Sequence, residues 1–340
     1  MDLNGKKIMI TNCCGLGDLI MFTPILRAIK KFFPTCKITF LCKNIHKEVL
    51  SRLPYVDKVV CIYRGKIFGR YRAIPDLFGQ DIIIFTDWHT VPLIFAKIFQ
   101  IPMRIGYFRE ESFLTKFLTK ELRGNIFDSI DYAACTNAKI ICDALEIEID
   151  DDMTNIEISP PTSQEIQSVD KILKNIGLDK NCEFILLTPY TGFEPRNLPT
   201  EIMKNFIVLV EENFKIPVII SAPPEKFKDA KIFSKYALNI ETSIGEFVEL
   251  VNRSKILVTP DSGPMHVAGA LQKNCVAIFS KDLPSRWAPK KNCLPLYLNL
   301  SCSPCDDETA KKCSHLSCIK NISAQMIFAA CEKFLRISTE

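Results

Sequence analysis

The chain has 340 residues, of which 47% are hydrophobic and 24% are charged, with 43 Lys and Arg against 39 Asp and Glu. This composition is typical of a folded globular protein and excludes a disordered, collagen-like or coiled-coil chain. The length allows about two domains. No apolar stretch reaches the roughly 18–20 residues of a membrane span. The N-terminus lacks the apolar core of a signal peptide, so we expect a cytoplasmic protein.

Charge is distributed unevenly along the chain. Residues 1–127 carry 20 Lys and Arg against 10 Asp and Glu, whereas residues 128–160 carry one Lys and nine acidic residues. A basic region favours an anionic partner such as nucleic acid, an acidic membrane surface or a phosphorylated ligand. The alternative is that clusters such as Arg64, Lys66, Arg70 and Arg72 are ordinary solvated side chains.

The N-terminal half alternates between strand and helix patterns. Residues 7–12 form an apolar run that ends in a glycine-containing turn, and apolar residues then recur at helical spacing from Leu19 until Pro34. Further strands are expected at 37–42, 58–62 and 81–86, with a helix at about 127–145. This alternation predicts an α/β, doubly wound sheet of mostly parallel strands.

Pro160 and Pro161 mark the expected boundary between two domains, 1–159 and 160–340. A second alternating series follows the boundary. Its expected strands are 184–188, 218–221, 256–259 and 276–279, and its expected helices are 164–176, 201–214, 244–252 and 264–271. We allow for the terminal helix, 321–335, packing back on the N-terminal domain. Two such halves are expected to place a ligand cleft near the carboxyl ends of their strands.

The first candidate site is the turn Gly15-Leu16-Gly17-Asp18, which follows the first strand. It does not fit the dinucleotide fingerprint, because Ile20 stands where the third glycine belongs. Glycines at a turn let another molecule approach the backbone. Asp18 is therefore either a helix-capping residue or a carboxylate that acts on a bound molecule.

The second candidate site is the segment 258–266, where a strand ends in a polar turn. Pro264 occupies a plausible first helical position. The backbone N–H groups of this helix start, with the Ser262 hydroxyl and Gly263, form a natural anion site. His266, close to Asp261, is either a structural histidine or a ligand for a phosphate or a sugar hydroxyl.

The third candidate site is the segment 189–199, which also follows a strand. Thr191 and Arg196 could both reach phosphate oxygens there. The alternative is a surface loop with an incidental arginine.

The chain has 15 cysteines, and four of them cluster near the C-terminus. An odd number without an export signal does not indicate a disulfide framework. The clustered residues are Cys302, Cys305, Cys313 and Cys318, with the spacing C-x₂-C-x₇-C-x₄-C. Four thiols over this span could hold a structural zinc ion, and the alternative is a thiol-rich loop without metal.

Together, the order and spacing of the three candidate sites resemble glycosyltransferase family 9, the bacterial heptosyltransferases of lipopolysaccharide core assembly. The resemblance runs through most of the chain. The matching residues are Gly17-Asp18, Thr23-Pro24, Leu26-Arg27 and Pro34, then Pro189 to Arg196 with Pro199, then Asp261-Ser262-Gly263-Pro264-Met265-His266-Val267-Ala268-Gly269-Ala270, and finally Pro284, Arg286, Trp287 and Pro289.

This resemblance implies a GT-B fold, with two facing Rossmann-like domains, the acceptor on the N-terminal one and the nucleotide sugar on the C-terminal one. It implies transfer of a heptose from ADP-heptose to an inner-core sugar, with inversion at the anomeric carbon. Asp18 matches the general base, and Gly15 and Gly17 lie in its loop on the acceptor side. The implied donor-binding residues are Thr191, Arg196, Asp261, Ser262, Gly263 and His266.

The resemblance also sets expectations for cofactors and partners. No metal is required, because a fixed cation and a helix start can hold the diphosphate. The implied acceptor is an anionic, lipid-linked core oligosaccharide, which the basic N-terminal region suits, so we expect peripheral contact with the inner face of the inner membrane and no nucleic-acid partner.

Some residues depart from the family pattern. The chain has Asn12-Cys13-Cys14 where an Arg is common, Arg196 where Lys is commoner, and no His near Asp128. Arg keeps the positive charge but presents a planar fork. These departures leave open a family member that uses another nucleotide sugar for a different surface glycan. A non-catalytic polyanion-binding protein is the alternative from another class.

Overall fold

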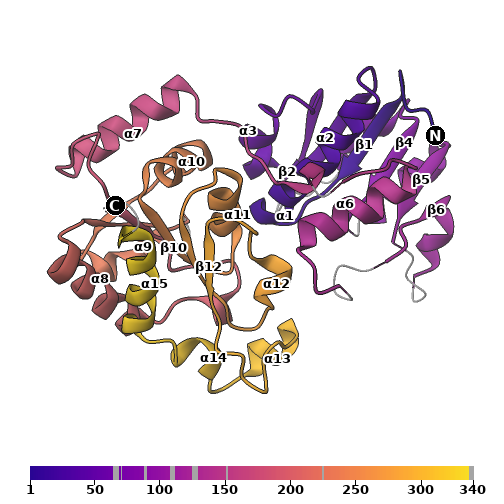
Figure 1. Ribbon diagram of the computed structural model, residues 1–340. Helices are drawn as coiled ribbons and strands as arrows, with labels where there is room; N and C mark the ends of the chain where they lie inside the picture. The colour runs from indigo at the N-terminus through magenta and orange to yellow at the C-terminus, as the bar shows by residue number, and fades with distance from the viewer. Residues whose placement is uncertain are drawn as a thin grey trace. The chain divides into compact units, whose positions relative to one another are not determined.

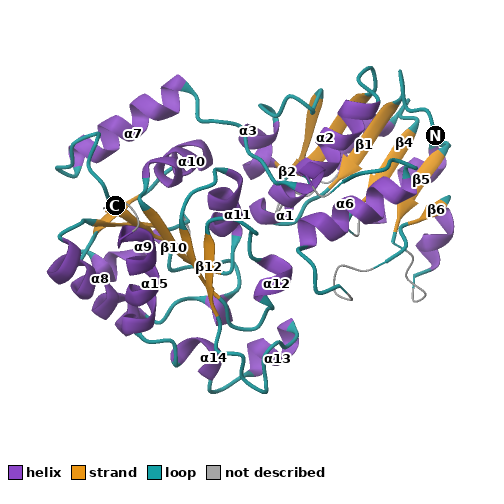
Figure 2. Cartoon of the chain, viewed as in Figure 1, coloured by secondary structure: helices purple, strands orange, loops and turns teal. Residues whose placement is uncertain are grey.

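The computed structural model describes residues 1–63, 69, 71–87, 90–107, 112–124, 129–150, 152–223 and 226–336. The chain forms two compact units, Met1–Ser159 and Pro160–Glu340, which divide at the boundary that Pro160-Pro161 indicates. Each unit is a twisted sheet covered by helices (Figures 1 and 2). Arg64, Lys66, Arg70 and Asp128, which entered the sequence argument, lie outside the described residues.

The N-terminal unit contains six parallel strands in the order β3-β2-β1-β4-β5-β6. In the central strand β1, every residue after Lys7 is buried, because helices cover both faces of the sheet. Ile8 lies beside Ile38 of β2 and Ile82 of β4. The bounds are β1 Lys7–Thr11, β2 Lys37–Lys43, β3 Lys58–Ile62, β4 Ile82–Phe85, β5 Met103–Gly106 and β6 Lys120–Glu121.

The helices of this unit differ from the sequence prediction, which did not include α3, α4 and α5 and which began α6 too early. The single helix expected before Pro34 is two helices, which meet at Phe22. Pro24 lies in the first turn of the second helix, where its missing N–H is tolerated. The bounds are α1 Leu16–Met21, α2 Thr23–Phe32, α3 Lys47–Leu50, α4 Ile74–Leu77, α5 Thr90–Ile98 and α6 Ala133–Ala144, with 3₁₀ turns η1 Asn44–His46, η2 Tyr71–Ala73, η3 Phe113–Phe117 and η4 Asp152–Thr154.

The acidic segment before the domain boundary is fixed to α2. Arg27 donates hydrogen bonds to the carbonyl oxygens of Met153 (2.7 Å) and Asn155 (2.8 Å), and it forms an ion pair with Glu157 at 3.1 Å. The hydroxyl of Thr23 accepts the backbone N–H of Glu157 at 3.0 Å. Thr23 and Arg27, which match the family signature, therefore have a structural role in this unit.

The C-terminal unit also contains six parallel strands, in the order β12-β11-β10-β7-β8-β9. Two of them, β9 and β12, are not predicted from the sequence because Asn239 interrupts the first and Pro295 interrupts the second. The bounds are β7 Ile185–Leu187, β8 Val218–Ser221, β9 Leu238–Ile240, β10 Ile256–Pro260, β11 Cys275–Ile278 and β12 Cys293–Leu296.

Two helices of the C-terminal unit begin with capping boxes, in which side chain and backbone satisfy each other's polar groups. Thr162 and Glu165 form the first, at α7, and Ser243 and Glu246 form the second, at α10. The bounds are α7 Ser163–Asn175, η5 Glu194–Arg196, α8 Thr200–Phe214, α9 Phe227–Ala230, η7 Lys231–Phe233, α10 Ile244–Arg253, α11 Gly263–Ala270, α12 Pro284–Trp287, α13 Asp307–Lys312, α14 Ser317–Lys320 and α15 Ala324–Arg336.

The terminal helix α15 belongs to the C-terminal unit, and its packing on the N-terminal unit stays a prediction. It lies against α8 and the strands β11 and β12 of its own unit. Ile327 and Cys331 are buried in the C-terminal core, and the ring of Phe328 stacks on Phe214 with centroids 4.9 Å apart. The apolar side of α15 is needed to complete this core.

Candidate active site

Asp18 lies in the first turn of α1, directly after the turn that ends β1. One oxygen of its carboxylate accepts the backbone N–H of Gly15 at 2.8 Å, which ties the side chain back to the residue that precedes the helix. The side chain is half-buried and Gly15 is exposed. A carboxylate is favoured in a first turn by the helix dipole. Asp18 therefore has a capping role and is also held rigidly at a partly open position.

Asp87 is a second carboxylate at this edge of the sheet, and the sequence analysis missed it. It follows β4, the neighbour of β1. Its carboxylate accepts the backbone N–H of Cys13 at 2.6 Å and the hydroxyl of Thr11 at 3.3 Å. The side-chain oxygen of Asn12 accepts the backbone N–H of Cys14 at 3.1 Å. With Gly15 bound to Asp18, three successive backbone N–H groups are held by side chains. An acidic residue directly after a buried strand is the signal that could have revealed Asp87.

The pKa of the Cys14 thiol shows the effect of the negative charges in this loop. Desolvation, followed by the negative charges of Asp18 and then Asp87, raises the pKa of this thiol to about 12. It is therefore protonated at neutral pH and a poor nucleophile. Lys43 donates from its ammonium to the Cys14 carbonyl oxygen at 2.7 Å. The loop thus combines two carboxylates with a nearby cation, a set suited to binding hydroxyl groups and accepting a proton.

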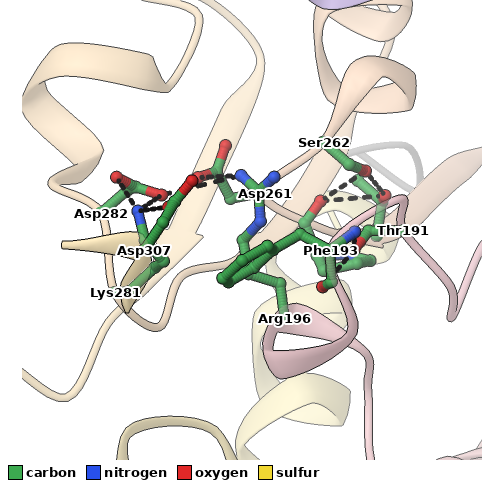
Figure 3. A network of polar contacts seen from close by, with 10 residues as sticks. Thr191, Phe193, Arg196, Asp261, Ser262, Lys281, Asp282 and Asp307 are labelled. Atoms are coloured by element: carbon green, nitrogen blue, oxygen red, sulfur yellow. Dashed lines mark hydrogen bonds and ion pairs between the residues drawn. The ribbon is translucent and has the colours of Figure 1, made fainter. Parts of the chain in front are cut away.

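The C-terminal unit places Arg196 and Asp261 side by side (Figure 3). Arg196 comes from η5, after β7, and Asp261 lies between β10 and α11, at the carboxyl ends of neighbouring strands. The guanidinium Nη1 lies 3.4 Å from an oxygen of Asp261 and 3.6 Å from an oxygen of Asp282. Arg196 Nε is buried without a hydrogen-bond partner. Both ion pairs are long, so the guanidinium retains capacity to bind an anion.

Burial raises the pKa of Asp261 to about 7. The positive charge of Arg196 acts in the opposite direction, Asp282 raises the pKa further, and Lys281 lowers it. An ordinary Asp has a pKa near 3.9. The charge of this site therefore changes close to neutral pH.

A ring of cations surrounds Phe193 in the same loop. Arg196, Lys281 and Lys311 lie 5.5, 5.9 and 5.7 Å from the ring centroid, within cation–π range. Lys281 also forms ion pairs with Asp282 at 2.9 Å and Asp307 at 3.0 Å (Figure 3). Sequence reasoning found Arg196 but missed Lys281, Lys311 and Asp307, because these three belong to segments outside the three motifs and only the fold brings them together.

Thr191 and Ser262 shape the two loops beside Arg196. The Thr191 hydroxyl donates to the carbonyl oxygen of Phe193 at 2.7 Å and accepts its N–H at 2.9 Å. The Ser262 hydroxyl donates to the carbonyl oxygen of Pro260 at 3.0 Å and lies 3.1 Å from the hydroxyl of Thr259. Ser262 precedes α11, which begins at Gly263, but its side chain does not cap that helix. The helix start therefore keeps backbone N–H groups that its own cap residue does not satisfy.

His266 lies inside the first turns of α11 and is buried. Burial lowers its pKa to about 4, so the imidazole is neutral at physiological pH. A charge-based contact with a phosphate would thus require a large change in its surroundings, whereas a neutral ring can still donate one hydrogen bond.

The four C-terminal cysteines are free thiols. The Cys313 sulfur accepts the backbone N–H of Leu316 at 3.4 Å. Within the described ranges of the chain, no group of three or more His, Cys, Asp or Glu side chains is placed to hold a metal ion. The cysteines therefore do not form a ready ligand set, and zinc binding stays a prediction. The described helices also include none that is both long and apolar enough to cross a membrane.

Known proteins share both the sequence pattern and the fold. The family model described as "Glycosyltransferase family 9 (heptosyltransferase)" matches residues 84–315. A Haemophilus influenzae protein named "Lipooligosaccharide heptosyltransferase 2" is 23% identical over 303 residues, which cover 83% of this chain and 86% of that protein. A Haemophilus ducreyi protein of the same name is 23% identical over 304 residues, with the same coverage of both chains.

Two solved structures are similar along nearly the whole chain. A family 9 glycosyltransferase from Veillonella parvula has a TM-score of 0.84 at 19% identity and covers 99% of both chains. The E. coli ADP-heptose lipopolysaccharide heptosyltransferase II has a TM-score of 0.77 at 17% identity and covers 98% of this chain and 100% of that one. The expected fold class, two Rossmann-like units of the GT-B type, is confirmed. Since the family model covers more than half of the sequence, the chain belongs to glycosyltransferase family 9, the heptosyltransferase family, and is a glycosyltransferase.

Proposed function

We propose that this enzyme transfers a heptose from ADP-heptose to the inner core of lipopolysaccharide or lipooligosaccharide, with inversion at the anomeric carbon. The observation that carries the proposal is the site around Arg196. The guanidinium of Arg196 forms two long ion pairs, and the start of α11, in the same unit, has no side-chain cap. Both features suit a diphosphate. The names of the Haemophilus relatives and of the E. coli structure support the choice of sugar and acceptor.

On the donor side, we assign the C-terminal unit to the nucleotide sugar. Arg196 and the start of α11 at Gly263 would hold the diphosphate as negative charge develops on it. Ser262 and Thr191 would contribute hydroxyl groups, although both now bind backbone oxygens. Asp261 and the neutral His266 would contact sugar or phosphate by hydrogen bonds. No metal ion is required in this proposal, because the guanidinium and the helix start supply the positive charge.

On the acceptor side, we assign the N-terminal unit to the core oligosaccharide and Asp18 to the general base. Asp18 takes the proton of the acceptor hydroxyl, whose oxygen forms the new bond to the anomeric carbon. The bond from that carbon to the diphosphate breaks, and ADP leaves with the electron pair. Attack from the face opposite the leaving group gives inversion. A positioned base typically contributes about 10²–10⁴-fold to the rate.

The decisive experiment measures ADP release from ADP-heptose with a truncated core acceptor. Asp18→Asn should retain ADP affinity and thermal stability and lose about 10²–10⁴-fold in turnover. Asp143→Asn, on the exposed side of α6, is the matched control and should be unchanged. If Asp18→Asn keeps most of the wild-type rate while binding donor normally, the base assignment is wrong.

The same assay separates the alternatives. A panel of nucleotide sugars identifies a family member with another donor, because only the correct sugar then supports nucleotide release. Binding of polyanions without release from any donor would favour a non-catalytic protein. Metal analysis of the reduced protein tests zinc at Cys302, Cys305, Cys313 and Cys318, and less than half an equivalent would rule it out. We also propose a location at the inner face of the inner membrane, in the cytoplasm.

A further inference from the structure

The N-terminal unit exposes large apolar side chains on elements that the candidate active site does not use. Phe78 follows α4, Ile98 ends α5 and Phe113 begins η3, and these side chains are 74%, 59% and 67% exposed. We call these three residues the aromatic patch. Exposed phenylalanine is unfavourable in water, so a group of such residues indicates a surface that meets an apolar partner.

The elements that carry the patch pack on one another and on the core of this unit. α5 packs against both α4 and η3. The ring of Phe78 meets that of Phe99 edge to face at 5.6 Å, and Phe113 meets Phe117 in the same way at 5.9 Å. Phe99 and Phe117 in turn pack on a buried core of this unit. The exposed rings of Phe78 and Phe113 are therefore the outer members of aromatic pairs that rest on the core, and not isolated surface residues.

Two exposed lysines lie on the same elements as the patch. Lys97 and Lys116 are exposed, and the Lys116 ammonium lies 5.4 Å from the centroid of the Phe113 ring. Asp76, the acidic residue of α4, is ion-paired to Lys58 at 2.6 Å. Among the described residues of α4, α5 and η3, the unpaired charges are thus positive.

We propose that the aromatic patch docks the enzyme on an anionic membrane surface. Aromatic rings enter the interface between headgroups and acyl chains, while lysines reach the lipid phosphates. A second copy of the chain is disfavoured as the occupant, because a two-fold contact would bring like-charged lysines together. The inference deepens the proposed function, since it rests on a lipid-linked acceptor and states which face approaches it.

Sedimentation with vesicles tests this inference on the full chain. Vesicles of phosphatidylglycerol and phosphatidylethanolamine should bind the wild type, and pure phosphatidylcholine vesicles should bind it at least tenfold less. The triple variant Phe78→Ser, Ile98→Ser, Phe113→Ser should bind the anionic vesicles at least tenfold more weakly. Ile45→Ser and Ile232→Ser, which replace side chains that are 59% and 52% exposed elsewhere, should bind like the wild type.

Charge variants add an independent readout. Each of Lys97→Gln and Lys116→Gln should weaken binding about fivefold at low salt. The difference should disappear at high salt, because the attraction is screened. All variants should keep the wild-type unfolding temperature, since the replaced side chains are exposed.

Turnover with a water-soluble acceptor keeps this inference separate from the proposed function. The triple variant should retain the wild-type turnover with this acceptor. A loss of vesicle binding with intact turnover therefore supports the docking surface. Equal vesicle binding by wild type and triple variant would overturn it, as would a triple variant that loses only self-association in analytical ultracentrifugation. Absent turnover in the wild type contradicts the proposed function and leaves the vesicle result to decide the patch.

Discussion

Replacing Arg196 with methionine would test the electrostatic coupling of the donor-side site. Arg196 is the strongest influence that lowers the pKa of Asp261, which burial raises to about 7. At pH 6 most Asp261 side chains are protonated, and at pH 8 most are ionised. The loss of Arg196 should therefore destabilise the protein more at pH 8 than at pH 6, because only the ionised carboxylate needs the guanidinium.

The expected size follows from the geometry. Two unit charges 3.4 Å apart interact by about 5 kcal/mol at an effective dielectric constant of 20. Solvation of the partly exposed Arg196 offsets much of that energy, and a hydrogen bond to a charged group is typically worth about 1.5–3 kcal/mol. We expect a loss of about 2–3 kcal/mol in the free energy of unfolding at pH 8 and about 1 kcal/mol at pH 6. The difference corresponds to a further rise of about one unit in the pKa of Asp261.

The same experiment also tests whether the stability of the wild type falls or rises with pH because of Asp261. Because the folded pKa of Asp261 lies above its unfolded value, the folded state binds more protons between about pH 4 and pH 7. The contribution of Asp261 to stability should thus decrease as pH rises through this window, by up to about 1.4 kcal/mol per pH unit, and stay constant above it.

Urea unfolding at pH 6 and pH 8 provides the measurement. Arg253→Met is the matched control, since Arg253 belongs to the same unit and pairs with Asp170 at 2.6 Å and Glu249 at 2.5 Å. Because Asp261 is not among the partners of Arg253, the control should lose the same amount of stability at each pH value. An equal loss for Arg196→Met at the two pH values would show that Asp261 does not titrate in this range.

Three further predictions concern the loops and the domain boundary. A Cβ at Gly15 would lie 3.2 Å from the Asp18 carboxylate, so Gly15→Ala should lower turnover about tenfold in the ADP-release assay. Gly192→Ala is the control, because a Cβ at Gly192 would have no atom within 4 Å, and it should not lower turnover. Asp87→Asn removes a negative charge beside the base loop and should shift the acidic limb of the pH–rate profile to lower pH; an unmoved limb would make Asp87 purely structural. Thr162→Ala removes the capping box of α7 and should destabilise the C-terminal unit by about 1 kcal/mol in urea unfolding.

The sequence predicts the central strands well because burial on both faces demands uninterrupted apolar residues. β1, β4 and β10 satisfy this demand almost completely. The outer strands β9 and β12 escape prediction because a strand at the margin of a sheet tolerates Asn239 or Pro295. The break between α1 and α2 cannot be predicted from the sequence for a different reason. The apolar residues of the two helices follow a single helical spacing that continues across Phe22.

The candidate site is predictable only where one short segment carries the chemistry. Asp18 and Asp261 stand in turns whose glycines mark them in the sequence. Asp87, Lys281 and Asp307 act through neighbours that are distant along the chain, so their roles depend on strand order. Asp87 meets Cys13 only because β4 lies beside β1, and Lys281 meets Asp307 only because the start of α13 lies against the loop after β11.

Residues that match the same N-terminal family signature have different roles in the structure. Thr23 and Arg27 hold the segment that leads to the domain boundary, whereas Asp18, one turn earlier, faces partly outward. A shared signature therefore does not imply a shared role in catalysis. The same distinction applies to Thr191, whose hydroxyl already shapes its own loop, so any contact with a donor phosphate must compete with two existing hydrogen bonds. Arg196 forms only long ion pairs and has an Nε without a hydrogen-bond partner, so it retains more capacity for an anion than Thr191, and we propose it as the anion-binding residue.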